Sequence, residues 1–123
     1  MEKNRIIIDT SGYSAYLRGS PAIRLAIQQA SEIFFNPIII GELLAGYIIG
    51  KSEKKNREIL QEFLSSLRVK IVDIDEETSE RYAIIMNHLR TKGTPIPTND
   101  LWIAASAMQH GLMVLTTDNH YLK

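Results

Sequence analysis

The sequence predicts an α/β fold, with a central, mostly parallel sheet flanked by helices on both faces. Short apolar runs alternate along the chain with longer segments of helical periodicity, a pattern typical of consecutive βαβ units. The first run, Arg5–Ile8, is β-branched without polar alternation, as expected for a strand buried on both faces. No linker or internal repeat divides the 123 residues, so we expect one domain covering residues 1–123.

Residues 12–18 and 21–31 are predicted to form a helical hairpin. Between them, Ser20 suits a helix N-cap and Pro21 suits the first helical position, where its missing N–H has no intrahelical partner to lose. Glu32–Phe35 then follows as the second strand.

A second cap-and-proline signal, Asn36-Pro37, begins a helix that we expect to run to Ile49 and to end at Gly50. Another amphipathic helix is predicted over residues 53–66. Its expected buried residues are Ile59, Phe63 and Leu67.

The same alternation continues to the end of the chain, where two strands and two helices are expected. They are a strand over Val69–Ile74, a helix over Glu76–Lys92 stopped by Gly93, a helix from Thr98 or Asn99 to His110, and a strand over Met113–Thr116.

Composition excludes several classes of protein. Hydrophobic residues make up 45% of the chain and charged residues 23%, which is ordinary globular composition. The formal net charge is zero, so any nucleic acid must be held locally and not by a generally basic surface. The absence of cysteine excludes disulfides and thiolate ligands and fits a cytoplasmic protein. The longest apolar stretch is far shorter than the roughly 20 residues of a membrane span, so no membrane association is expected.

Two aspartates each follow a predicted strand. Asp9 comes directly after Ile6-Ile7-Ile8, and Asp118 comes shortly after the strand that ends at Thr116. Ligands of parallel sheets bind beyond the carboxyl ends of the strands, so both carboxylates are expected at one rim. Each aspartate taken alone is also explained as a loop or cap residue.

Two further acids stand on predicted helices. Asp100 lies in the first turn of its helix, where the helix dipole alone accounts for it. Glu42 lies inside the apolar run Ile38–Ile49, where we expect it to be buried and where neither capping nor the dipole explains a carboxylate. Its simplest structural explanation is a salt bridge to an arginine.

Four ionised carboxylates on one rim repel one another, and a bound divalent cation removes that repulsion. Oxygen ligands without histidine or cysteine favour Mg²⁺ or Mn²⁺ over zinc. A metal at such a cluster polarises a phosphate and activates water for hydrolysis.

Four motifs around these acids resemble the PIN domain, in particular the small ribonuclease toxins of the VapC type. They are Ile8-Asp9-Thr10-Ser11, the segment Pro37–Gly46 around Glu42, the segment Pro97–Ala105 around Asp100, and Leu115-Thr116-Thr117-Asp118. Their order and spacing agree with the family over essentially the whole length, although relatives continue into a further edge strand where this sequence stops at Lys123.

The resemblance implies a PIN-like three-layer sandwich with a parallel sheet of four to five strands. It implies a metal-dependent endoribonuclease that cleaves single-stranded RNA, a cognate antitoxin that binds over the site, and a homodimer. The implied ligands of Mg²⁺ or Mn²⁺ are Asp9, Glu42, Asp100 and Asp118.

Polar neighbours of the acids are candidates for orienting the carboxylates or contacting phosphate, with ordinary capping as the alternative. They are Thr10, Ser11, Asn99, Thr116 and Thr117. Arg90 and Lys92 are candidate RNA contacts. A denser basic cluster could also bind RNA or an acidic partner, but we interpret it as a solvent-exposed helix face; its residues are Lys51, Lys54, Lys55 and Arg57. His120 could donate a proton or contact phosphate, but we interpret it as an exposed histidine near the terminus.

Two other functions compete with the nuclease. A catalytically silent PIN-like module would bind RNA or protein, but it has no physical need for four clustered carboxylates. A phosphotransferase with Asp9 as nucleophile would want a second acid two residues later, where this chain has Ser11.

Overall fold

The structure is a computed structural model that describes residues 4–94 and 96–117. Its centre is a four-stranded sheet built from β1 (Arg5–Ile8), β2 (Glu32–Phe35), β3 (Val69–Ile71) and β4 (Met113–Leu115). All strand pairs are parallel, and the order across the sheet is β3-β2-β1-β4. The predicted parallel sheet flanked by helices is confirmed.

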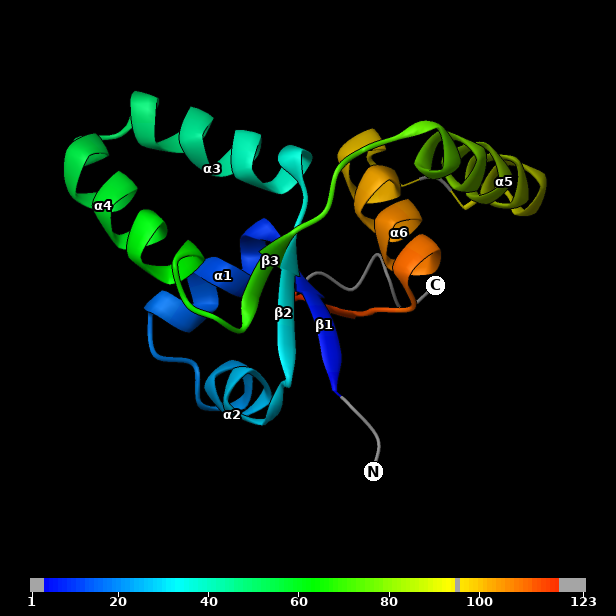
Figure 1. The fold of residues 1–123 in the computed structure, drawn as a ribbon. Coiled ribbons are helices and arrows are strands. Elements are labelled where there is room, and N and C mark those ends of the chain that lie inside the picture. Colours follow the sequence, from blue (N-terminus) through cyan, green and yellow to red (C-terminus); the bar gives the residue numbers. More distant parts are fainter. Residues whose placement is uncertain (1–3, 95, 118–123) are drawn as a thin grey trace.

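Six helices connect these strands. They are α1 (Thr10–Leu17), α2 (Pro21–Gln29), α3 (Pro37–Ile49), α4 (Glu53–Leu64), α5 (Glu76–Lys92) and α6 (Thr98–His110). The helices α1 to α4 lie on one side of the sheet, and α5 and α6 lie on the other (Figure 1). This division follows from right-handed crossovers, because the chain builds β1, β2 and β3 in one direction and then returns past β1 to form β4.

The return to β4 creates the switch point of the sheet between β1 and β4. Ile8 pairs with Leu115 at the carboxyl end of this strand pair. The backbone N–H of Asp9 continues the ladder by donating to the Leu115 carbonyl at 3.3 Å. In open α/β sheets, the crevice outside such a switch point is where ligands bind.

Local capping fixes where the helices begin. The Asn36 side chain accepts a hydrogen bond from the Ile39 N–H at 2.9 Å, which confirms the predicted start of α3. Asp75 and Thr78 form a capping box at the start of α5. The Thr78 N–H, then the Gln109 and Thr78 side chains, hold the pKa of the Asp75 carboxyl below its usual range. Ser20 precedes α2 but makes no side-chain cap bond, so that predicted interaction is absent.

The core between the sheet and α1 to α4 contains an aromatic cluster. Tyr13 is fully buried, and its ring meets Phe35 and Phe63 edge-to-face at centroid distances of 5.8 and 5.4 Å. Burial, followed by the nearby Tyr47 and Tyr16, raises the pKa of the Tyr13 hydroxyl. That hydroxyl has no hydrogen-bond partner among the residues described.

Of the three residues predicted to be buried on α4, Ile59 and Phe63 are partly buried, whereas the prediction for Leu67 is wrong. Leu67 is 96% exposed, because α4 ends at Leu64 and is capped at Ser65, so the helical spacing that would bury Leu67 stops before it. The third strand is also shorter than predicted, ending at Ile71 instead of Ile74.

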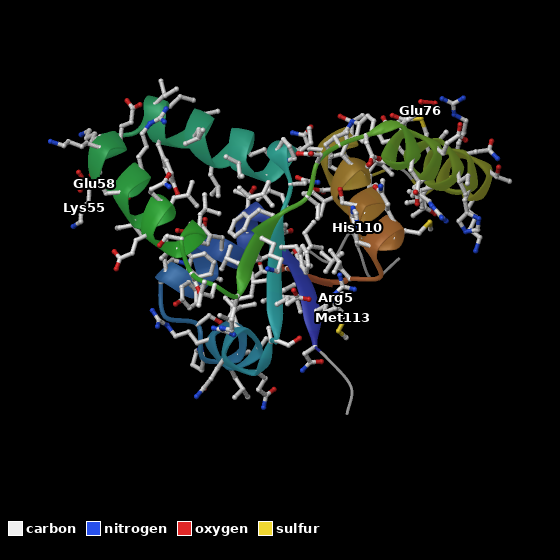
Figure 2. The ribbon with its side chains drawn as sticks, viewed as in Figure 1. Arg5, Lys55, Glu58, Glu76, His110 and Met113 are labelled. Atoms are coloured by element: carbon white, nitrogen blue, oxygen red, sulfur yellow. The ribbon has the colours of Figure 1, made fainter. Side chains whose placement is uncertain are left out.

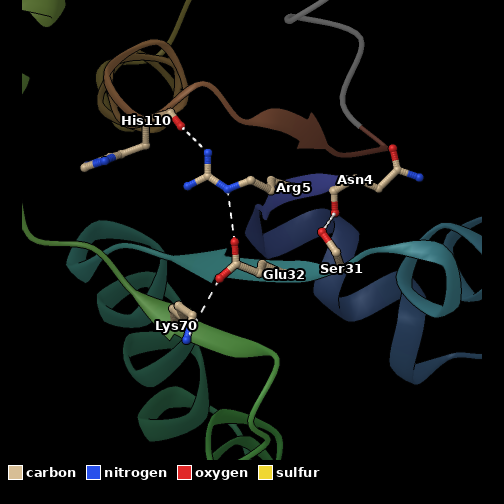
Figure 3. Close-up of polar contacts among 6 residues, drawn as sticks. All are labelled: Asn4, Arg5, Ser31, Glu32, Lys70 and His110. Atoms are coloured by element: carbon tan, nitrogen blue, oxygen red, sulfur yellow. Dashed lines mark hydrogen bonds and ion pairs between the residues drawn. The ribbon is translucent and has the colours of Figure 1, made fainter. Parts of the chain in front are cut away.

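The amino ends of the strands are held together by one arginine (Figure 3). Arg5 donates from Nε to Glu32 Oε1 at 3.1 Å and from Nη1 to the His110 carbonyl at 3.0 Å. Lys70 Nζ lies 4.0 Å from the other Glu32 oxygen. These side chains are partly exposed, so the charge pairs add little stability. The hydrogen bond from Arg5 to the His110 carbonyl fixes the end of α6 against β1.

None of the helices described is long and apolar enough to cross a membrane.

We expect Tyr13→Phe not to lower the free energy of unfolding at pH 7 and to raise it by at most about 3 kcal/mol. The substitution removes a buried hydroxyl that has no hydrogen-bond partner among the residues described. The pKa of Tyr13 is higher in the folded than in the unfolded chain. Below pH 10 the hydroxyl is neutral in both states, and above pH 10 it ionises in the unfolded chain first, which lowers the free energy of unfolding. Wild type should therefore lose more stability above pH 10 than the variant does. Urea unfolding at pH 7 and pH 10.5 measures both effects. Tyr16→Phe, in the same cluster but partly exposed, is the matched control. A clear loss of stability in Tyr13→Phe at pH 7 would contradict this account.

Candidate active site at the carboxyl rim

Asp9 stands at the switch point as the N-cap of α1, and its side chain is 4% exposed. Its Oδ1 accepts hydrogen bonds from the Gly12 N–H at 2.8 Å and from Ser11 Oγ at 3.0 Å. Its Oδ2 accepts from Thr116 Oγ1 at 2.5 Å. All three donors are neutral, so within the described chain no cation balances this buried carboxylate.

Two hydroxyls join Asp9 to the chain that follows β4. Ser11 Oγ lies 3.1 Å from Thr116 Oγ1 and accepts from the Thr117 N–H at 3.2 Å. Three of the residues selected from the sequence therefore form one hydrogen-bonded group with Asp9. The Thr117 contribution comes from its backbone.

Glu42 lies on α3 and is only partly buried, so the expectation of a carboxylate enclosed in an apolar run is wrong. Of the residues of α3, Ile39 and Leu43 are buried, and Ile40, Leu44 and Tyr47 pack against the core while partly exposed. The carboxylate accepts from Thr10 Oγ1 at 2.8 Å through Oε1 and from Asn99 Nδ2 at 2.9 Å through Oε2. It pairs with no arginine or lysine of residues 4–94 and 96–117, which removes the salt-bridge explanation.

Asp100 lies in the first turn of α6 and is half-buried. The bond from Asn99, its neighbour in the chain, holds this turn against Glu42. Thr10, the neighbour of Asp9, holds the other Glu42 oxygen. Hydrogen bonds thus connect the segments that carry Asp9, Glu42 and Asp100.

The described residues do not by themselves complete a metal site. Within residues 4–94 and 96–117, no three acidic or histidine side chains form a group that could hold one ion. Asp118 and His120, both selected from the sequence, lie outside the described residues. Their placement therefore remains a prediction.

The chemistry of the donors at the rim fits a hard divalent cation. An ionised carboxylate offers about four acceptor positions. Asp9 uses three of them in the bonds above and Glu42 uses two, so each retains capacity for a ligand. An oxygen-rich rim with an unbalanced buried carboxylate therefore has the donors that a hard divalent cation needs.

The sequence matches the PIN domain family over residues 6–123. The chain belongs to that family. It is 34% identical to ribonuclease VapC1 of Rickettsia felis over 113 residues, which cover 90% of this chain and 83% of that relative. It is also 34% identical to ribonuclease VapC4 of Mycobacterium tuberculosis over 84 residues, which cover 68% of this chain but only 65% of VapC4.

A solved structure shows the same fold. The DNA-bound VapBC complex from Salmonella typhimurium matches with a TM-score of 0.85 at 24% identity, covering 98% of this chain and 92% of the matched chain. Together with the two named relatives, the family match identifies a PIN domain of the VapC type.

The candidate RNA contacts lie elsewhere on this PIN domain. Arg90 and Lys92 occupy the last turn of α5 and are exposed. Arg90 lines a mainly apolar cavity of about 330 Å³ between α5 and the start of α6. The start of α4 is a solvated face as interpreted, since Lys55 and Glu58 point outward there (Figure 2).

Gly12 is a site residue that sequence reasoning missed. A Cβ atom at this position would lie 2.5 Å from the Leu115 carbonyl oxygen and 3.2 Å from Asp9 Oδ1. Any side chain would therefore force α1 away from the end of β4. The sequence signal was present but weak, because a glycine three residues after a strand-ending aspartate is also common in turns.

We expect Gly12→Ala to lower the free energy of unfolding by about 1–3 kcal/mol, because backbone atoms must move to admit the methyl group. Urea unfolding measures the loss. Gly46→Ala is the matched control, since nothing lies within 4 Å of its added Cβ and alanine favours the interior of α3. A Gly12→Ala protein as stable as wild type would show that the rim does not require this close approach.

Proposed function

We propose that this chain is the toxin of a toxin–antitoxin pair and acts as a metal-dependent endoribonuclease on single-stranded RNA. The observation that carries the proposal is the hydrogen-bonded rim, in which Asp9 and Glu42 are held by neutral donors and balanced by no cation of the described chain. The similarity to two proteins named ribonuclease VapC supports the same activity.

In this proposal, Asp9, Glu42, Asp100 and Asp118 hold Mg²⁺ or Mn²⁺. The bound ion supplies charge that polarises the scissile phosphate and favours the hydroxide form of a water molecule. Thr10 and Asn99 orient Glu42, while Ser11 and Thr116 orient Asp9. Because water and not the RNA 2′-hydroxyl attacks, the products carry a 5′-phosphate and a 3′-hydroxyl.

The chain has a formal net charge of zero, so a few basic side chains, and not a generally basic surface, hold the RNA. Arg90 and Lys92 remain our candidates for backbone contacts, since both are exposed and neither forms an ion pair among the described residues. Such contacts weaken with added salt, as phosphate contacts do generally.

Protein partners are proposed at the exposed apolar surfaces. Ile48 and Ile49 at the end of α3 are 61% and 87% exposed, and Ile84 on α5 is 57% exposed. Exposed apolar side chains on helices favour association. The partners that the VapC resemblance implies for these surfaces are a second copy of this chain and a cognate antitoxin.

A catalytically silent PIN-like module is the second candidate. It is favoured by one observation, that the described residues contain no group of three possible metal ligands. It predicts RNA or protein binding without cleavage at any metal concentration.

Asp9→Asn should reduce RNA cleavage at least a hundredfold while the fold is retained, because asparagine also caps helices but does not supply a charged ligand. Cleavage of a single-stranded RNA with added Mn²⁺, with the product ends identified, measures this. Asp73→Asn, at an exposed aspartate shortly after β3, which β2 separates from β1, should cut like wild type. Undiminished cleavage by Asp9→Asn, or 2′,3′-cyclic phosphate ends, would refute the assigned mechanism.

Expression of the wild-type chain in a bacterial host should arrest growth, and expression of Asp9→Asn at the same level should not. Growth curves with matched protein amounts, followed by immunoblotting, test the toxin role. Equal arrest by both forms would show that toxicity does not come from cleavage at this rim.

A further inference from the structure

Asn36 and Ser106 form a buried polar pair that has no place in the roles above. Both residues are 0% exposed. Asn36 Nδ2 donates a hydrogen bond to Ser106 Oγ at 3.0 Å, while Asn36 Oδ1 accepts the cap bond from Ile39. One side chain therefore both starts α3 and binds α6.

The bond joins helices from opposite layers. α3 belongs to the layer on one face of the sheet and α6 to the layer on the other, yet the start of α3 lies against α6 (Figure 1). A polar bond in this position is strong, because no water competes for it.

A second bond between the same two helices lies nearer the rim. Glu42 is six residues beyond Asn36 on α3, and Asn99 is seven residues before Ser106 on α6. Glu42 and Asn99 are bonded at 2.9 Å. The helices thus run antiparallel between two bonds separated by about 9–10.5 Å of helix, given a rise of 1.5 Å per residue.

The two bonds differ in exposure. The Asn99 bond is exposed to solvent, so water competes with it and it contributes less to the helix contact than a buried bond does. The Asn36–Ser106 bond is shielded from solvent, and breaking it leaves a buried donor without an acceptor. The buried Asn36–Ser106 bond therefore sets how the segments that carry Glu42 and Asn99 meet.

We infer that Asn36 and Ser106 are positioning residues, which set the separation of Glu42 on α3 from Asp100 on α6 and so the shape of the ion site. The inference rests on the proposed function. It assigns the two residues no contact with RNA or metal.

The test uses the whole chain and Mn²⁺ alone, with free Mn²⁺ measured by electron paramagnetic resonance in the absence of RNA. Ser106→Ala removes the acceptor, and Asn36→Ser keeps a capping oxygen but removes the amide that reaches Ser106. Each variant should bind Mn²⁺ about tenfold more weakly, the scale seen for outer partners of metal ligands. The double variant should be no weaker than the weaker single variant, because both remove the same bond.

RNA cleavage gives a second readout. The Mn²⁺ concentration for half-maximal cleavage should rise about tenfold in both single variants. Cleavage at saturating Mn²⁺ should recover to near the wild-type rate, because the ligands themselves are intact.

Thr78→Val is the matched control for a merely structural effect. Thr78 is also 0% exposed, and its hydroxyl bonds to Gln109 of α6 and to Asp75 at the start of α5, so these bonds tie α6 to α5 and not to α3. This variant should lose stability and keep wild-type Mn²⁺ affinity.

Wild-type Mn²⁺ affinity in both Ser106→Ala and Asn36→Ser would overturn the inference, as would an equal loss in Thr78→Val. Additive losses in the double variant would also contradict it. Failure of the proposed function is a different result, in which wild type binds no Mn²⁺ or Asp9→Asn leaves that binding unchanged.

Discussion

The architecture of the rim depends on the close approach of α1 to the end of β4. Asp9 makes this contact, because its backbone N–H extends the ladder to Leu115 while its carboxylate accepts from both Gly12 and Thr116. The approach is possible because Gly12 has no side chain. The same contact buries a carboxylate beside neutral donors, which is costly without a balancing charge and therefore suits a cation-binding role.

The order β3-β2-β1-β4 explains why residues distant in sequence meet there. Strands are added to the sheet in one direction from β1 to β3 and then on the other side of β1 for β4, and this switch opens a crevice at the carboxyl ends of β1 and β4. α3 approaches it from one layer with Glu42, and α6 approaches from the other with Asp100. The far end of α6 is held by the bond from Arg5 to the His110 carbonyl. The rim is thus assembled from helices of both layers.

Much of this arrangement was predictable because its signals are local. The starts of the strands, the Asn36 cap and the glycine that ends α5 all depend on a few neighbouring residues, and each lies where it was expected. The burial of Glu42 and Leu67 was predicted wrongly, because burial depends on which distant elements pack against a helix. Gly12 and Ser106 were missed for a related reason. Each is required by a partner about 70–100 residues away, Asn36 for Ser106 and Leu115 for Gly12. Small residues of this kind carry no chemical signal of their own.

The most direct measurement is a crystal structure of the whole chain grown with Mn²⁺, with data collected for anomalous scattering. The account predicts an anomalous peak about 2.1 Å from a carboxylate oxygen of both Asp9 and Glu42. It also predicts that Asp118 lies in contact with the same ion or with a second ion beside it. A rim without a peak at saturating Mn²⁺, or a peak bound only by other residues, would contradict the central claim that these carboxylates form a metal site.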